Sequence, residues 1–300
     1  MEEVRIDFPS ATGAGSNEVV IQCLSELTPL DALEMSCGKS DPTGLCVWLG
    51  GFLFLELLVR KAEQENNPTR LQSYWSTIRR HLFPPGCTVC ELGAGAGLVG
   101  IAMSIGGVCS DIMLTDCNSD VLKLCKLNAL QNRCPEVNIE HLEWGEGNAS
   151  ELGLGGTFDT VYATDVLYDL DSLEPLMVTA SELLDERGRF ILSHVPRASI
   201  DEGHDVGSDY WSSLESIILQ KALATGFEPA SFPVCAESRS AREMLIAEMK
   251  NGSGDSPGGM ILRPNLLFLV NQSGTDCLSK NHTWERMQEA GAAVFVFDKI

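Results

Sequence analysis

Three glycines at alternate positions follow a short apolar run near residue 90, and this stretch constrains the fold more than any other. Residues 88–92 have the length and apolar content of a buried strand, and an apolar helical pattern begins at Leu98. The glycines between them are Gly93, Gly95 and Gly97. Glycine is favoured where the backbone adopts a positive φ or where a ligand touches the main chain. The stretch therefore predicts a strand, a glycine turn and a helix start that together hold a ligand.

The spacing of the glycines separates two classes of nucleotide-like ligand. A dinucleotide fingerprint needs a third glycine three positions after the second, where this chain has Leu98. Glu91, two residues before the first glycine, would repel a pyrophosphate but would tolerate a cation. A turn that binds nothing is the alternative, although three glycines then cost backbone entropy without a structural return. The pattern favours a cationic ligand that lacks phosphate.

Composition and charge restrict the class of protein and of partner. The chain has 300 residues, of which 44% are hydrophobic and 21% charged, which suits a soluble protein with one large domain. Its formal net charge of -21 argues against a nucleic-acid partner, which would require clustered Lys and Arg. A basic protein partner remains compatible with this charge. The longest apolar run, residues 45–59, is too short to cross a bilayer, so no membrane partner is expected.

Cysteine usage indicates an intracellular protein without a metal site. The eleven cysteines are an odd number, and the polar, acidic residues 1–7 carry no secretory signal. We therefore expect reduced thiols and a cytoplasmic location, with the nucleus as a second compartment. A monomer is also expected. Cys87 and Cys90 form a single C-x-x-C, whereas a zinc site needs a second pair of ligands.

Strand and helix patterns alternate from residue 87 onward. This alternation predicts an α/β fold with a Rossmann-like, seven-stranded, mostly parallel sheet that has helices on both faces. The expected helices cover residues 98–105, 120–132, 173–184, 209–225 and 238–250. The expected strands cover residues 88–92, 111–115, 137–142, 157–164, 189–195, 226–234, 266–270 and 293–297. The pattern does not decide which of the last strands pairs in the main sheet.

The first 84 residues are expected to form an N-terminal helical extension, and residues 85–300 the catalytic domain with a variable insertion near 235–291. Val20, Cys23 and Leu27 fall at helical spacing and predict a short amphipathic helix over residues 19–28. Two further helices are expected over residues 52–62 and 69–82, and two prolines and a glycine end the second one.

Polar and aromatic residues follow the second and third strands of this pattern. Asp116 lies about twenty residues past the glycine turn, where an acidic side chain can bind a ribose diol. A helix-capping aspartate is the alternative, although Asn118 or Asp120 could cap that helix instead. Trp144, followed by Gly145, can lie beside a flat heterocycle, while an isolated tryptophan is more often a core residue.

Asp165 ends the fourth strand at the carboxyl edge of the sheet, where open α/β sheets bind their ligands. Tyr168 follows three residues later, and the two side chains share a face if the turn is helical. The alternative for Asp165 is a helix N-cap.

These stretches together resemble one branch of the class I, seven-β-strand S-adenosylmethionine-dependent methyltransferases. The branch is that of the methyltransferase-like protein-lysine methyltransferases, methyltransferase family 16. The resemblance covers about residues 44 to 232. The glycine motif alone indicates only class I, while W-G and D-x-x-Y together are more selective. The motifs are Gly44-x-x-Val47-Trp48, E-L-G-A-G-A-G-L-V-G-I, Asp116, L-E-W-G and D-V-L-Y.

The resemblance implies S-adenosyl-L-methionine as cofactor and a protein as substrate. Asp165 and Tyr168 would face the substrate amine, and Glu91 and Gly97 would shape the cofactor pocket. Cofactor contacts would come from Trp48, Gly93, Ala94, Gly95, Asp116, Trp144 and Thr164. The chain departs from the family at Thr164, where a small apolar residue is frequent, and in its longer tail beyond residue 234.

Three functions follow as hypotheses. The first is N-methylation of a lysine side chain of a protein. The second is methylation of another acceptor, such as a protein histidine, a small-molecule amine or another metabolite. The third is a cofactor-binding scaffold without catalysis, against which the intact Asp165 and Tyr168 count.

Overall fold

The structure is a computed structural model of the whole chain. It describes residues 1–9, 16–28, 31, 35, 41–59, 79–109, 111–195, 208–230, 261–262 and 292–300. The predicted helix over residues 238–250 and the predicted strand over 266–270 lie outside these ranges, as does nearly all of the insertion expected near 235–291.

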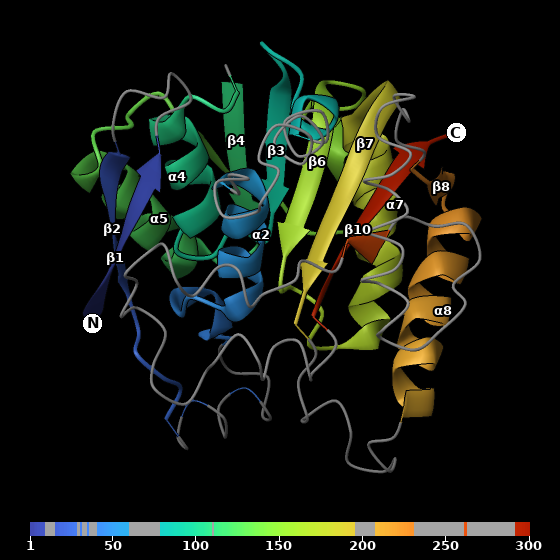
Figure 1. Cartoon of the computed structure of the whole chain (residues 1–300), viewed down its shortest axis with the longest axis horizontal. Helices are drawn as coiled ribbons and strands as arrows, with labels where there is room; N and C mark the ends of the chain where they lie inside the picture. The colour runs from blue at the N-terminus through green and yellow to red at the C-terminus, as the bar shows by residue number, and fades with distance from the viewer. Residues whose placement is uncertain are drawn as a thin grey trace, which may run out of the picture.

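A mostly parallel sheet forms the centre of the molecule (Figure 1). Its strands are β3 (Thr88–Leu92), β4 (Asp111–Asp116), β5 (Asn138–His141), β6 (Phe158–Thr164), β7 (Leu184–His194), β8 (Phe227–Pro229), β9 (Ile261–Leu262) and β10 (Ala293–Lys299). Among the described residues the order is β5-β4-β3-β6-β7-β10-β8, and β9 pairs with another part of β10. Strands β3 to β7 are parallel, and β10 runs antiparallel to β7 and β8. The predicted Rossmann-like sheet is confirmed, and β8, β9 and β10 of the tail join it, with β10 next to β7.

Helices cover both faces of this sheet, as predicted. They are α2 (Leu49–Val59), α4 (Leu98–Gly106), α5 (Ser119–Gln131), α6 (Asn148–Glu151), α7 (Leu173–Leu183) and α8 (Ser208–Ala224), with 3-10 turns η1 (Thr43–Leu45) and η2 (Leu170–Ser172). Side chains from α2, α4 and α5 form one core with one face of the sheet, and those from α7 and α8 form a second core with the other. No helix of the described residues is long and apolar enough to cross a membrane.

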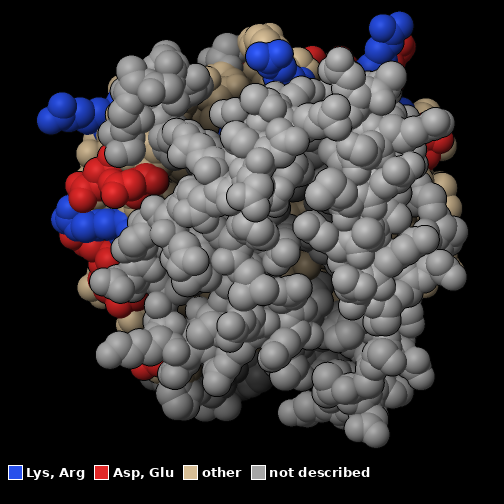
Figure 2. Space-filling model, in the orientation of Figure 1, with Lys and Arg blue, Asp and Glu red and all other residues tan. Residues whose placement is uncertain are grey.

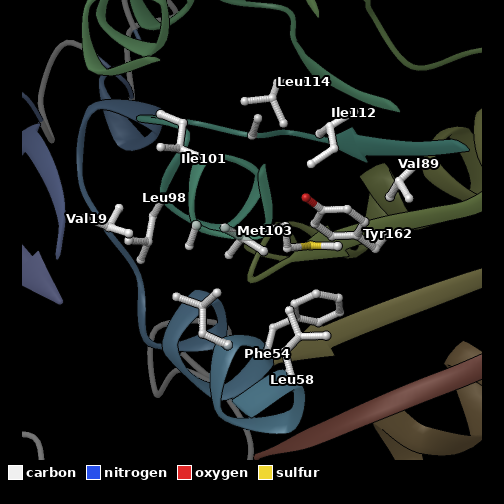
Figure 3. Close-up of a cluster of buried hydrophobic side chains, with 14 of the residues drawn as sticks. Val19, Phe54, Leu58, Val89, Leu98, Ile101, Met103, Ile112, Leu114 and Tyr162 are labelled. Carbon is white, nitrogen blue, oxygen red and sulfur yellow. The ribbon is translucent and has the colours of Figure 1, made fainter. Parts of the chain in front are cut away.

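Alternation along the strands sends neighbouring residues into different cores. Val89 of β3 and Tyr162 of β6 lie in the first core, while Cys90 and Val161 lie in the second. Phe54 of α2 stacks on Tyr162 with ring centroids 4.8 Å apart (Figure 3). A strand buried on both faces carries an almost continuous apolar run, which is why the sequence predicted β3 and β6 within one residue.

The N-terminal residues form strands, so the helix predicted over residues 19–28 is wrong. Antiparallel strands β1 (Glu2–Pro9) and β2 (Ser16–Cys23) make a separate two-stranded sheet beside α4 and α5 (Figure 1). Val19, Ile21 and Cys23 are all buried, and this spacing of two is the period of a strand. The N-terminal extension is therefore helical only in part: α2 matches the helix predicted over 52–62, and of the helix predicted over 69–82 only residues 79–82 are described.

Two asparagines, Asn128 of α5 and Asn132 at its C-cap, attach this N-terminal sheet to the core. Asn128 accepts a hydrogen bond from the Gln22 backbone N–H at 2.9 Å and donates to the Gln22 carbonyl at 3.0 Å. Asn132 makes the same pair of bonds with Val20, at 2.9 and 2.6 Å. The side-chain amides thus take the place of a neighbouring strand along the edge of β2. Charged side chains of both signs lie on the side of the molecule where β1 and β2 are found, at the left of Figure 2.

Candidate active site

The glycine turn has the backbone conformation that its sequence predicted. Gly93, Gly95 and Gly97 have φ values of 67°, 56° and 87°, all in the left-handed region. Gly97 is the N-cap of α4, and a Cβ atom there would come within 2.7 Å of the Cys125 sulfur of α5. The turn therefore brings β3, α4 and α5 close together at the carboxyl edge of the sheet.

A cavity of about 930 Å³ opens above this turn. It lies at the carboxyl ends of β3, β4 and β6, and residues of the 41–51 segment close its other side. Gly97 does not line it, so of the predicted pocket residues Gly97 acts only through the shape of the turn. The other predicted residues all line it: Trp48, Glu91, Gly93, Ala94, Gly95, Asp116, Trp144, Thr164, Asp165 and Tyr168.

The lining of this cavity is acidic. Its carboxylates belong to Asp41, Glu91, Asp116, Glu143 and Asp165, and no Lys, Arg or His is among its described lining residues. A phosphate-bearing ligand would meet repulsion here, whereas a cation would be attracted. The acidic lining therefore fits a cationic, phosphate-free cofactor better than a dinucleotide.

Asp116 is free of the helix-capping role that the sequence left open. Asn118 caps α5, since its Oδ1 accepts hydrogen bonds from the backbone N–H groups of Asp120 and Val121 at 2.9 and 3.3 Å. The carboxylate of Asp116 instead accepts from the backbone N–H of Gly95 at 3.1 Å. Burial raises the pKa of Asp116 above its ordinary value. The side chain thus sits against the glycine turn at the cavity wall, where a ribose diol can reach it.

Glu91 lies beneath the turn and is almost fully buried, at 1% exposure. Its Oε2 accepts hydrogen bonds from the Tyr162 hydroxyl at 3.0 Å and from the backbone N–H of Gly100 at 3.1 Å. Burial raises the pKa of Glu91 to about 8. In the absence of a cation, most molecules at neutral pH therefore carry Glu91 as the neutral acid.

Trp144 stands beside the first glycine of the turn. A Cβ atom at Gly93 would lie 3.2 Å from the Trp144 ring, so only glycine permits this approach without displacement. Helix α7 holds the loop from behind: the Gly145 backbone N–H donates to Thr179 Oγ1 at 2.8 Å, and the Gly147 N–H to Glu182 Oε1 at 2.6 Å. The ring is therefore fixed at the cavity wall by contacts on both sides.

Asp165 is held by the protein in a way that the sequence did not indicate. Its φ is 60°, a left-handed value that is uncommon for a residue with a side chain, and it is 4% exposed. Its Oδ2 accepts from the backbone N–H of Gly50 at 3.1 Å, and its Oδ1 from that of Val195 at 3.2 Å. Gly50 lies in the first turn of α2, where the helix dipole favours a negative charge.

The structure decides two points that the sequence left open at this turn. Asp165 is not a helix N-cap, because Asp169 caps η2 and accepts from the Asp171 N–H at 2.9 Å. The residues after Asp165 are not helical either, so Asp165 and Tyr168 do not share a helical face. The strained backbone at Asp165 turns its carboxylate inward, and this conformation could not be predicted from a spacing of three.

Tyr168 is 46% exposed and reaches across the cavity mouth. Its hydroxyl donates to Asp41 Oδ2 at 3.0 Å, and the Asp41 carbonyl accepts from the Asn118 side-chain amide at 2.8 Å. Partial burial, followed by the charge of Asp41, raises the pKa of Tyr168. The chain Tyr168–Asp41–Asn118, called the strap below, links the loop after β6 to the loop after β4.

Three residues at this site escaped the sequence prediction: Asp41, Gly50 and His194. Gly50 left a signal, because two consecutive glycines at a helix start suggest a close approach of another chain segment. A Cβ atom at Gly50 would come within 2.6 Å of the Asp165 Cβ. Asp41 and His194 left none, since their partners are far away in the sequence.

Known proteins with similar sequences are methyltransferases. The protein N-lysine methyltransferase METTL21A of Mus musculus is 31% identical over 112 residues, which make up 36% of this chain and 49% of that protein. The histone-arginine methyltransferase METTL23 of Mus musculus is 27% identical over 150 residues, or 49% of this chain and 54% of that protein. The chain thus spans about half the length of these curated relatives.

Among solved structures, the geranyl diphosphate C-methyltransferase of Streptomyces coelicolor A3(2) matches with a TM-score of 0.44 and 11% identity, over 81% of this chain and 85% of that chain. The family model described as lysine methyltransferase matches residues 29–216, which is more than half of the 300 residues. The chain belongs to the lysine methyltransferase family.

Proposed function

We propose that this protein transfers the methyl group of S-adenosyl-L-methionine to a lysine side chain of a protein. The observation that carries the proposal is the cavity above the glycine turn, with its carboxylates and without a basic lining residue. Membership of the lysine methyltransferase family supports the choice of acceptor.

The described residues fit this cofactor in three places. The Asp116 carboxylate, held against Gly95, would bind the ribose hydroxyls. The Trp144 ring beside Gly93 would lie along the adenine. The acidic lining would favour the ammonium and sulfonium charges. When bound, the sulfonium supplies a methyl group that is already activated for attack by an amine.

Asp165 would orient the substrate amine. Two backbone N–H groups hold its carboxylate still, so the carboxylate presents a fixed negative charge at the cavity wall. Alignment of the amine with the methyl group can supply roughly 7–11 kcal/mol of the barrier reduction. Only the neutral amine attacks, and free lysine has a pKa of about 10.4, so a proton must leave before transfer. The exposed ring of Tyr168 would offer the incoming cation a face.

A second acceptor is favoured by one observation. The similarity to a mouse histone-arginine methyltransferase extends over 150 residues, and a guanidinium is as cationic as an ammonium. We therefore keep N-methylation of a protein arginine as the alternative to lysine. A cytoplasmic or nuclear site of action is part of the proposal, since none of the eight cysteines among the described residues belongs to a disulfide.

The test is incubation of a cell lysate with radiolabelled S-adenosylmethionine and the purified protein, followed by mass spectrometry of the labelled band. A methylated lysine supports the proposal, a methylated arginine supports the alternative, and label only in small molecules contradicts both. Asp165→Ala should abolish transfer but leave the affinity for S-adenosylhomocysteine within a few-fold. The matched control is Asp169→Ala, which changes an exposed aspartate four residues away.

A further inference from the structure

Within the described part of the chain, His194 is a buried imidazole without a hydrogen-bond partner. It is the last residue of β7 and is 2% exposed, and no described residue forms a hydrogen bond with either ring nitrogen. Leaving a buried polar group unpaired costs the free energy of its desolvation, so such groups are rare in native proteins. Nδ1 of this ring lies 3.6 Å from Oδ1 of Asp165, the carboxylate at the cavity wall. The unpaired imidazole and the strained aspartate are therefore neighbours.

The residues on either side of His194 hold the same corner of the site. The Ser193 hydroxyl donates to the Gly50 carbonyl at 2.8 Å, and the Val195 backbone N–H donates to Asp165 Oδ1. The Asp165 backbone N–H in turn donates to the Ser193 carbonyl at 2.7 Å. The end of β7 thus fixes Asp165 on both sides and sets the imidazole against it.

Few charged groups compete with Asp165 for this imidazole. Asp165 is the one carboxylate within 4 Å of the ring among the described side chains. Helices α7 and α8 cover the sheet face to which alternation assigns His194, and their Glu174 and Lys221 pair with each other near the surface. Strand β10 has an alanine opposite His194.

We infer that His194 is a positioning residue that acts through Asp165 and takes over the proton which the substrate amine must lose, an inference that rests on the proposed function. An N–H bond of the substrate ammonium breaks, its electron pair stays on nitrogen, and the proton passes to Asp165 Oδ1 and on to Nδ1 of His194. The neutral amine then forms its bond to the methyl carbon while the C–S bond breaks and leaves its electron pair on sulfur. The imidazolium returns its proton to solvent before the next cycle.

The distance between the two groups suits such a transfer. At 3.6 Å they do not form a hydrogen bond, but a movement of less than about 1 Å brings them to the 2.7–3.2 Å of a normal one. Each oxygen of the Asp165 carboxylate accepts a backbone N–H, and a carboxylate oxygen can accept more than one hydrogen bond. An unpaired imidazole is therefore available as the proton acceptor behind an anchored carboxylate.

The test is the pH dependence of transfer in two variants, with label transferred from radiolabelled S-adenosylmethionine to lysate protein as the measured rate. His194→Asn retains a polar group beside Asp165 but cannot accept a proton, and His194→Phe removes polarity. A general base contributes about 10²–10⁴-fold, so both variants should lose at least about 100-fold at pH 7. His141→Asn, at an exposed histidine of β5, is the control and should match the wild type.

The deficit should shrink as the pH rises to 9.5. From a pKa of about 10.4, roughly one free lysine in 2,500 is neutral at pH 7 and about one in ten at pH 9.5, so the acceptor becomes dispensable. The affinity for S-adenosylhomocysteine, measured by calorimetry, should stay within a few-fold of the wild type. Three results would overturn the inference: an equal deficit at every pH, full activity of His194→Asn at pH 7, or loss of S-adenosylhomocysteine binding. A wild-type protein that transfers no label at any pH would instead contradict the proposed function itself.

Discussion

Replacement of Glu91 by glutamine should make the protein more stable at high pH. The pKa of Glu91 rises from an ordinary 4.5 to about 8 because the side chain is buried. Between these values the folded protein holds a proton that the unfolded chain releases, so stability falls as the pH rises through this window. At 1.36 kcal/mol per unit, the loss from pH 5.5 to pH 8.5 is roughly 3 kcal/mol. Glutamine cannot ionise and should not show this loss.

The substitution retains the known contacts of the side chain. Both hydrogen bonds to Glu91, from Tyr162 and from Gly100, reach the same oxygen, Oε2. The carbonyl oxygen of a glutamine can occupy that place and accept both. The amide nitrogen then replaces the other oxygen, next to Thr164, whose side chain can accept from it.

Urea unfolding of the cofactor-free protein at pH 5.5, 7.0 and 8.5 measures this effect. We expect the free energy of unfolding of Glu91→Gln relative to the wild type to grow by roughly 3 kcal/mol between the lowest and highest pH. Ionisable groups that do not interact with Glu91 contribute equally to both proteins and cancel in the difference. A difference that is constant with pH would show that Glu91 has the same pKa in both states, and the reasoning from burial would be refuted.

Two further predictions concern the strap and the N-terminal sheet. Tyr168→Phe removes the hydrogen bond to Asp41, worth about 0.5–1.5 kcal/mol, and should raise the dissociation rate of S-adenosylhomocysteine up to about tenfold in stopped-flow fluorescence. Asp41→Asn keeps an acceptor for the hydroxyl, so a rate as fast as that of Tyr168→Phe would contradict this role of the bond. Asn128→Ala leaves the backbone of β2 without its partner and should lower the free energy of unfolding by about 2–4 kcal/mol in urea titrations. Leu127→Ala, at an exposed position of the same helix, should change it by less than about 0.5 kcal/mol, and equal losses would refute the anchoring role.

The order of strands and helices after residue 87 could be predicted because each element carries its own periodic pattern. Buried parallel strands have short apolar runs, and helices such as α4 follow directly after glycine. The first strands could not be predicted in the same way. Residues 16–23 contain apolar positions that match both a period of two and a helical spacing. The choice between a strand and a helix depends on Asn128 and Asn132, which bind β2 from more than 100 residues away.

The face of α5 shows the same dependence on distant contacts. Val121, Leu124, Leu127 and Leu130 lie three residues apart along α5, but Leu127 and Leu130 are each 62% exposed. The buried face includes Asn128 instead, because its amide is needed by β2 and by the carbonyl of Ala96 at 2.8 Å. The buried face of α5 therefore cannot be identified from the apolar residues alone, because the polar residue Asn128 belongs to it.

The sequence by itself determined the parallel strands of the sheet, the left-handed glycine turn and the pocket residues at the strand ends, because these follow from local periodicity and from the conformational range of glycine. Only the tertiary structure decided how Asp165 is held. Its partners, Gly50 and Val195, are 115 and 30 residues away, and no local pattern encodes a hydrogen bond across such separations. The same holds for His194 and Asp41, which reach the site only because β7 and the 41–51 segment fold against the carboxyl edge of the sheet.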